Sequence, residues 1–287
     1  MGEAKRRRPR NNRRFECIDQ ELINLGVDTS QWGFYDQPKF LAEESRDHNF
    51  LEKYAEWVNL RPFNDAYAEH VRGTVPRLTK LVHSEFVEHG FEGGCVAASG
   101  MISRILDRLG VWSFAVAGSL TLEVDGGRIR RMLHSVDEPD FAGAALGHAW
   151  VVAPPYQIMD ATISLQHWAA DEMGRHLPEF ILAAKEARKI RPTVGDVVSD
   201  KIRAQAAVAG YPDSDLHYRL EPRLRAFGAI FPAFEVSRGQ LILHYVPVAI
   251  RQTDVPLEQI NDEGDRGRPA IEFWREKIIP EFNLSYS

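Results

Sequence analysis

Cysteine is scarce in this chain. Its 287 residues include only Cys17 and Cys95, which is too few to cross-link a chain of this length or to build a cysteine-rich zinc site. Long apolar runs are also lacking, because no stretch approaches the ~18 consecutive apolar residues of a membrane span. No apolar segment near the N-terminus has the form of a secretory signal. These absences indicate a cytoplasmic protein with reduced thiols and no membrane partner.

The composition is typical of a folded globular protein, with 44% hydrophobic and 26% charged residues. The length allows one large domain or two modest ones. The formal net charge of −6 conceals an asymmetry. Seven basic residues and one acid give residues 1–14 a charge of +6, which leaves −12 for the rest of the chain. A basic N-terminal arm therefore precedes an acidic body.

The basic arm, residues 1–14, contains no large apolar residue apart from Met1. It cannot bury enough surface to order itself, so we expect it to be disordered. Clustered arginine binds phosphate, and one interpretation is contact with nucleic acid or another acidic partner. The alternative is a solvated tail that binds nothing. Both interpretations stay open on composition alone.

Residues 15–75 are interpreted as an N-terminal lead-in followed by helices. Polar residues and turn signals predict an irregular lead-in over 15–38. Apolar residues that recur at threes and fours predict helices over 39–60. A further helix is predicted to begin at Pro76, a favourable first-turn residue, and to end near His89.

Residues 91–110 carry the most informative helical pattern. After Cys95 the apolar residues fall on one face, and Gly110 stands where a C-terminal cap belongs. This face consists of Met101, Ile102, Ile105, Leu106 and Leu109. We therefore expect Cys95 in the first turn of a buried helix, directly after a flexible glycine pair.

The pattern then changes to the alternation that is typical of strands. Residues 114–124 alternate, and the following Asp-Gly pair predicts a hairpin turn with a returning strand. Two more strands are predicted over 148–152 and 156–163, separated by a proline pair. Together these elements indicate an α+β fold in which the helix that carries the cysteine packs on an antiparallel sheet.

Residues 166–287 are interpreted as a C-terminal mixed α/β extension of unknown role. Helices are predicted over 179–190 and 196–209, a strand over 241–250, and a closing helix over 268–279. This extension is either a second subdomain or a continuation of the first sheet.

Three residues in the core region have surroundings that suit catalysis: Cys95, His148 and Asp160. A helix N-terminus lowers the pKa of a thiol, and the backbone N–H of Cys95 could bind an oxyanion. The spacing of 12 positions between His148 and Asp160 suits a hairpin that brings both side chains to one sheet face. An imidazole beside the thiol would take its proton, and a carboxylate would orient that imidazole.

At these residues the sequence resembles the transglutaminase-like superfamily. Phe91–Ala98, with the helix and strand after it, resembles the cysteine segment of that superfamily. Gly147–Val152 resembles its histidine segment, and Ile158–Thr162 resembles its aspartate segment, in which threonine follows two residues after the aspartate. The resemblance covers about residues 76–165, which we take as the catalytic core.

The resemblance implies a papain-like α+β core with a Cys-His-Asp triad. Cys95 would be the nucleophile, His148 the general base and then acid, and Asp160 the orienting group. Active members of the superfamily share an acyl-thioester intermediate, but they include proteases, amidases, deamidases and cross-linking acyltransferases, and some members are inactive. The resemblance therefore indicates the reaction type better than the substrate.

Our leading hypothesis is a cysteine hydrolase of the protease or amidase type that acts on a protein, peptide or other amide substrate. One alternative is a transglutaminase-type acyltransferase or protein deamidase with the same triad. Another is a non-catalytic module that uses the basic arm to bind nucleic acid or protein.

Two further residues are candidates for lining the site. His89 stands six positions before Cys95 and could contribute to an oxyanion site, or it is an ordinary solvated histidine at a helix end. Trp150 points the same way as His148 on a strand, and it either walls the acyl site or is a plain core aromatic. The remaining histidines show no ligand spacing, so we predict no metal and no other cofactor.

Overall fold

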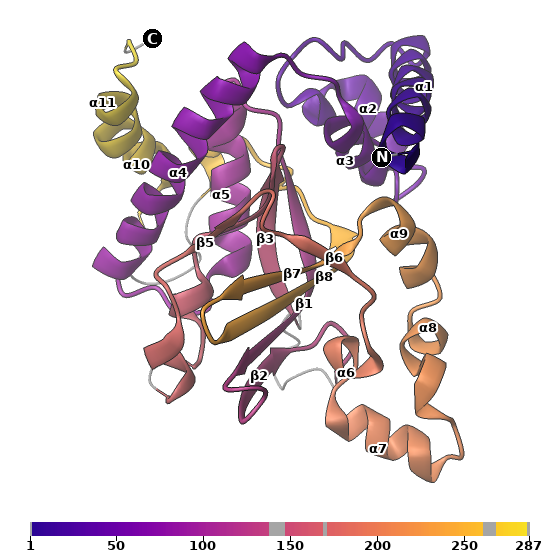
Figure 1. Cartoon of the computed structure of the whole chain (residues 1–287). Coiled ribbons are helices and arrows are strands. Elements are labelled where there is room, and N and C mark those ends of the chain that lie inside the picture. The colour runs from indigo at the N-terminus through magenta and orange to yellow at the C-terminus, as the bar shows by residue number, and fades with distance from the viewer. Residues whose placement is uncertain (1, 138–146, 169–170, 261–267, 286–287) are drawn as a thin grey trace.

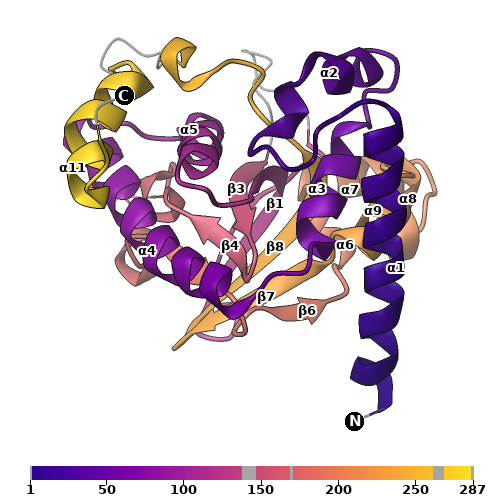
Figure 2. The ribbon, with the colours of Figure 1, turned by 90° about the horizontal axis from the view of Figure 1, so that it is seen from above.

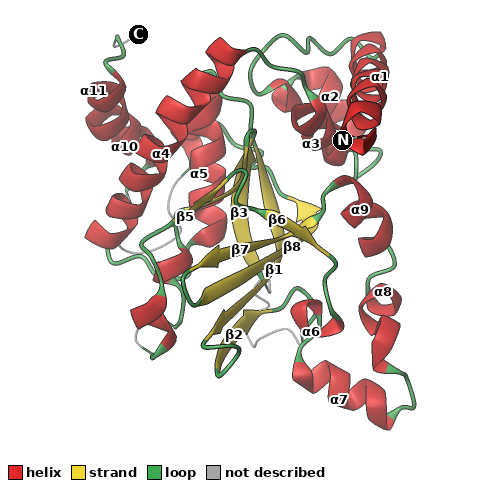
Figure 3. Cartoon of the chain, in the orientation of Figure 1, coloured by secondary structure: helices red, strands yellow, loops and turns green. Residues whose placement is uncertain are grey.

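The computed structural model describes residues 2–137, 147–168, 171–260 and 268–285, with the backbone alone for residues 2–10. Within these residues, eight strands form one antiparallel sheet in the order β5-β4-β3-β1-β8-β7-β6, and β2 pairs with β1 beside this path. The sheet is curled into a half-barrel (Figures 1 and 3). The strands are β1 (Phe114–Val124), β2 (Ile129–Leu133), β3 (His148–Ala153), β4 (Tyr156–Asp160), β5 (Ile181–Ala183), β6 (Arg188–Ile190), β7 (Ala233–Arg238) and β8 (Leu241–Ile250). The α+β expectation is therefore correct at this level.

Helices α4 (Asp65–Glu88) and α5 (Cys95–Arg108) cover one face of the sheet, and the C-terminal helices lie against α4 (Figure 2). These C-terminal elements are α10 (Ala270–Phe273), a π-helical turn (Trp274–Ile278) and α11 (Ile279–Phe282). Helix α5 packs its apolar stripe against Ala115 and Val151. It ends where Gly110 adopts a φ of +68°, which lets the Val111 N–H bond the Leu106 carbonyl at 2.9 Å.

The opposite face of the sheet packs against α1 (Gly2–Asn24), α2 (Pro38–Glu44) and α3 (Leu51–Leu60). Neighbouring strand residues point to opposite faces, and the two cores follow that rule. Ala115 and Val151 join the core of α5, whereas Val116 and Trp150 join the core that contains Trp57 of α3. The sheet is therefore buried on both faces where it carries the candidate site.

The segment between β6 and β7 forms α6 (Val194–Val197), α7 (Asp200–Val208), α8 (Leu216–Leu220) and α9 (Leu224–Ile230). In the described part of the chain, short 3-10 helices are formed by Phe34–Asp36, Ile163–Leu165, Met173–His176, Asp213–Asp215 and Leu257–Gln259.

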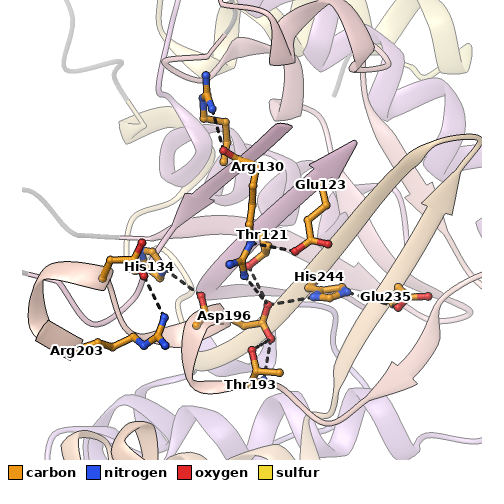
Figure 4. A network of polar contacts seen from close by, with 12 residues as sticks. Thr121, Glu123, Arg130, His134, Thr193, Asp196, Arg203, Glu235 and His244 are labelled. Atoms are coloured by element: carbon orange, nitrogen blue, oxygen red, sulfur yellow. Dashed lines mark hydrogen bonds and ion pairs between the residues drawn. The ribbon is translucent and has the colours of Figure 1, made fainter. Parts of the chain in front are cut away.

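A buried polar network fastens α6 to the sheet (Figure 4). The carboxylate of Asp196 accepts hydrogen bonds from Thr121 at 3.0 Å, from the Thr193 hydroxyl at 2.7 Å and from Nδ1 of His244 at 3.0 Å. Burial raises the pKa of Asp196, but these hydrogen bonds, led by that of His244, outweigh it and leave the pKa well below its usual range. Because Thr121 lies on β1 and His244 on β8, one carboxylate ties α6 to the two central strands.

The predicted disorder of residues 1–14 is wrong for the backbone, because α1 begins at Gly2. The irregular lead-in predicted from residue 15 is likewise wrong as far as Asn24. Ile18 and Leu22 are buried and anchor the helix, and Nε and Nη2 of Arg14 donate to the Glu56 carboxylate at 2.8 and 2.9 Å. Lys and Arg are good helix formers, so the anchored helix extends through the basic segment. The side chains of residues 2–10 lie outside the described part, so the predicted acidic partner of the arm stays a prediction.

The predicted helix start at Pro76 is also wrong. Helix α4 begins earlier, where the Asn64 side chain accepts a hydrogen bond from the Tyr67 N–H at 2.8 Å. Pro76 lies inside this helix, where proline costs roughly 3 kcal/mol. Burial of the adjacent Val75 and of Leu78 offsets that cost.

Residues 179–190 form β5 and β6 rather than the predicted helix, because each short strand completes an edge of the sheet next to β4 or β7. The strand predicted over 241–250 is confirmed as β8. It pairs with β1 in the middle of the sheet, so residues 166–287 continue the first sheet and are not a separate subdomain. Among the described helices, none combines the length and the apolar character needed to cross a membrane.

One buried acid makes the stability of this fold depend on pH. Asp107, near the end of α5, accepts a hydrogen bond at 2.8 Å from Tyr35, and its Oδ1 is buried without a hydrogen-bond partner among the described residues. Burial raises the pKa of Asp107 to about 7, although the Tyr35 hydrogen bond and the Arg104 charge act in the opposite direction.

We predict that Asp107→Asn flattens the pH dependence of stability. Between about pH 4 and pH 7 the folded chain keeps a proton that the unfolded chain releases, so the wild-type free energy of unfolding falls with rising pH, by up to about 1.4 kcal/mol per pH unit. Urea denaturation of both proteins across this range measures the difference. Equal slopes in the two proteins would contradict the prediction.

Candidate active site

The loop before α5 places Cys95 at the start of the helix. Gly93 has a φ of +73°, and its N–H donates to the Leu165 carbonyl at 2.8 Å. A β-carbon on Gly94 would lie 2.1 Å from the Phe91 ring, so only glycine fits there. The loop thus fixes Cys95 as the first residue of α5, where backbone N–H groups lack helical acceptors. The residue is 7% exposed.

His148 and Asp160 form a fully buried pair on neighbouring strands. Nε2 of His148, at the start of β3, lies 2.7 Å from Oδ2 of Asp160, at the end of β4. Both side chains have 0% exposure. The two strands are antiparallel, so the hairpin brings the side chains together as the 12-position spacing predicts.

The Asp160 carboxylate is held by donors from three parts of the chain. Oδ2 accepts from the Tyr245 hydroxyl of β8 at 2.9 Å as well as from His148. Oδ1 accepts from the backbone N–H of Thr162 at 3.0 Å and from its hydroxyl at 3.3 Å. Burial raises the pKa of Asp160, but the His148 charge and these hydrogen bonds outweigh it, so the net pKa is lowered. The aspartate is therefore ionised.

The charge of Asp160 controls the protonation of His148. Burial lowers the pKa of the imidazole, but the Asp160 carboxylate and then the Cys95 thiolate outweigh this effect and raise the pKa to about 10. Nε2 forms a hydrogen bond with Asp160. Nδ1 is therefore the ring nitrogen that could interact with the thiol. Nδ1 has no well-aligned hydrogen bond with any described residue.

The thiol of Cys95 responds to the same charges. Burial raises its pKa, and the Asp160 charge adds slightly to this. The interaction with His148 and a hydrogen bond from the Ala149 N–H outweigh both, so the pKa of Cys95 is lowered. The shifts of Cys95 and His148 have opposite directions, and both favour a thiolate beside an imidazolium.

Trp150 and Tyr245 form the packing behind His148. The Trp150 ring stacks on the imidazole with centroids 6.4 Å apart and meets the Tyr245 ring edge-on at 5.2 Å. Trp150 is 1% exposed, so the structure supports its interpretation as a core aromatic. A β-carbon on Gly118 would lie 2.9 Å from Trp150 and 2.0 Å from the Val246 carbonyl. A larger residue therefore does not fit at position 118, which pairs with His148.

His89 is not brought into contact with the triad within the described residues. Its Nδ1 lies 2.9 Å from the Glu85 carbonyl and 3.6 Å from the Glu85 carboxylate. It lines a small cavity with Phe86, Phe91 and Arg268. These contacts match the helix-end interpretation and give no support to a role in an oxyanion site.

Sequence reasoning missed Tyr245. The strand that carries it was predicted from its apolar run, and a tyrosine in such a run needs a buried partner for its hydroxyl. That signal could have marked Tyr245 as a polar contact, but the identity of the partner depends on the pairing of β8 with β1. As for metals, the described residues contain no group of three or more His, Cys, Asp or Glu side chains that could hold an ion.

Comparison with known proteins gives no family assignment. No protein-family model matches the chain, and searches of curated proteins and of solved structures found no match. Function is therefore inferred from the geometry of the site.

We predict that Tyr245→Phe lowers the free energy of unfolding by roughly 1.5–3 kcal/mol, the usual contribution of a hydrogen bond to a charged group. The change removes the hydroxyl that donates to Asp160 and keeps the ring that packs on Trp150. Urea denaturation measures the effect. Tyr211→Phe, at a side chain that is 54% exposed, is the control, and an equal loss in both variants would contradict the prediction.

Proposed function

We propose that the protein is a cysteine hydrolase of the protease or amidase type, with Cys95 as nucleophile, His148 as general base and acid, and Asp160 as the orienting carboxylate. The buried pair of His148 and Asp160 at 2.7 Å, with its effect on the Cys95 thiol, carries this proposal. The packing of α5 on an antiparallel sheet that bears His148 and Asp160 agrees with the papain-like core that the transglutaminase-like resemblance implies.

The proposed reaction begins with a thiolate and an imidazolium. The Cys95 sulfur attacks the amide carbonyl carbon, a C–S bond forms, and the carbonyl electron pair moves to oxygen. When this tetrahedral intermediate collapses, the C–N bond breaks, and the imidazolium of His148 gives its proton to the departing amine. The product of this half-reaction is an acyl thioester on Cys95.

Water completes the cycle. Neutral His148 takes a proton from a water molecule, whose oxygen attacks the thioester carbonyl. Collapse breaks the C–S bond, releases the carboxylic acid and regenerates the thiolate beside the imidazolium. Asp160 stays ionised throughout and stabilises the imidazolium. An amine in place of water would give acyl transfer, so a screen with and without an amine acceptor separates hydrolysis from the transglutaminase-type alternative.

We predict that iodoacetamide at about pH 6 labels Cys95 before Cys17. Cys17 is exposed and Cys95 is buried, so accessibility alone favours Cys17. Only a thiolate of lowered pKa reverses that order. The measurement is the time course of modification at each cysteine by peptide mapping.

The matched variants are His148→Ala and His48→Ala, the second at an exposed histidine between α2 and α3. We expect His148→Ala to slow the alkylation of Cys95 by at least about tenfold, since it removes the cation that lowers the thiol pKa. His48→Ala should leave the rate unchanged. Earlier labelling of Cys17, or the same Cys95 rate in all three proteins, would contradict the triad and favour a non-catalytic module.

A further inference from the structure

His167 is the exposed side chain of a segment that is otherwise anchored next to the triad. This segment follows Asp160 and Thr162. The amide of Gln166 donates to the Thr162 carbonyl at 3.1 Å, and the indole of Trp168 donates to the Ile163 carbonyl at 2.8 Å. Gln166 and Trp168 are buried, whereas His167 between them is exposed. The anchored neighbours therefore fix the backbone from which His167 projects.

The same segment lies against the loop that precedes the nucleophile. The Gly93 N–H donates to the Leu165 carbonyl at 2.8 Å. A β-carbon on Gly93 would lie 3.7 Å from Cε1 and 4.0 Å from Nε2 of His167, so the imidazole lies over Gly93. Because Gly93 is two residues before Cys95, the His167 ring stands next to the turn that presents the thiol.

The proposed reaction needs a donor at this place. Attack of the thiolate leaves a negative charge on the former carbonyl oxygen, and enzymes stabilise that charge with preorganised N–H donors. The Cys95 N–H, at the first position of α5, supplies one donor. His148 cannot supply a second donor in the proposed reaction, because its Nε2 binds Asp160 and its Nδ1 is the one nitrogen left to exchange a proton with the thiol.

We propose that the His167 imidazole donates a hydrogen bond to the oxyanion that forms when Cys95 attacks a carbonyl group. This inference rests on the proposed function. Among the described residues His167 has no hydrogen-bond or ion-pair partner, so an N–H is free to donate. The role differs from that of His148, since His167 acts on the substrate oxygen and leaves the thiolate unchanged.

Two reactions of Cys95 separate these roles. With p-nitrophenyl acetate, the sulfur attacks the carbonyl carbon, an oxyanion forms, and collapse expels p-nitrophenolate to leave an acetyl thioester. With iodoacetamide, the sulfur displaces iodide from carbon in one step and no oxyanion forms. Both reactions need the thiolate, but only the first needs an oxyanion donor.

We expect His167→Ala to slow acetylation of Cys95 by at least about tenfold, since loss of one oxyanion donor typically costs about 10²–10³ in rate. Alkylation by iodoacetamide should stay within about twofold of wild type, because the thiolate is unchanged. His167→Gln, which keeps an N–H donor, should recover part of the acetylation rate. His48→Ala, at another exposed histidine, should match wild type in both reactions. All four proteins are compared in a Cys17→Ser background.

Equal slowing of both reactions in His167→Ala would overturn the inference, since it would show an effect on the thiolate. Unchanged acetylation would overturn it as well. Failure of the proposed function looks different, because wild-type Cys95 would then react slowly with both reagents near neutral pH whatever residue occupies position 167.

Discussion

The structure depends on the ion pair between Asp160 and His148, which is removed from water on all sides. Burial of two charges costs several kcal/mol per ion unless the remaining polar atoms find partners. Here Tyr245 and Thr162 supply those partners to the carboxylate. The interaction with His148 also lowers the pKa of the Cys95 thiol.

The partners of the Asp160 carboxylate come from distant parts of the chain that lie in one sheet. Strands β3 and β4 carry the pair, and β8 returns to the centre of the sheet with Tyr245, 85 positions after Asp160. The two glycines before Cys95 allow the helix to start beside β3. Hydrogen bonds of the Asp196 carboxylate with Thr121 and His244 join α6 to β1 and β8. Both buried carboxylates therefore bind side chains of the central strand β8, Asp160 from β4 and Asp196 from α6.

Local patterns were sufficient for the elements nearest the site. The apolar stripe predicted α5, alternation predicted β1, an apolar run predicted β8, and the spacing between His148 and Asp160 predicted the hairpin that joins them. The failures have long-range causes. Strands β5 and β6 are short and exist because a neighbouring strand offers an edge. Pro76 signals a helix start, but packing holds it inside α4. Tyr245 was missed because its partner lies 85 positions away.

The proposed function requires Cys95 to be a thiolate at neutral pH because His148 is an imidazolium. The most direct measurement is the ultraviolet absorbance of the thiolate in Cys17→Ser, titrated from about pH 4 to about pH 10 and compared with the same variant that also carries His148→Ala. The account predicts thiolate absorbance well below the usual cysteine pKa of about 8.5, and an upward shift of the midpoint when His148 is removed. Absorbance that rises only above about pH 8.5 in both proteins would contradict it.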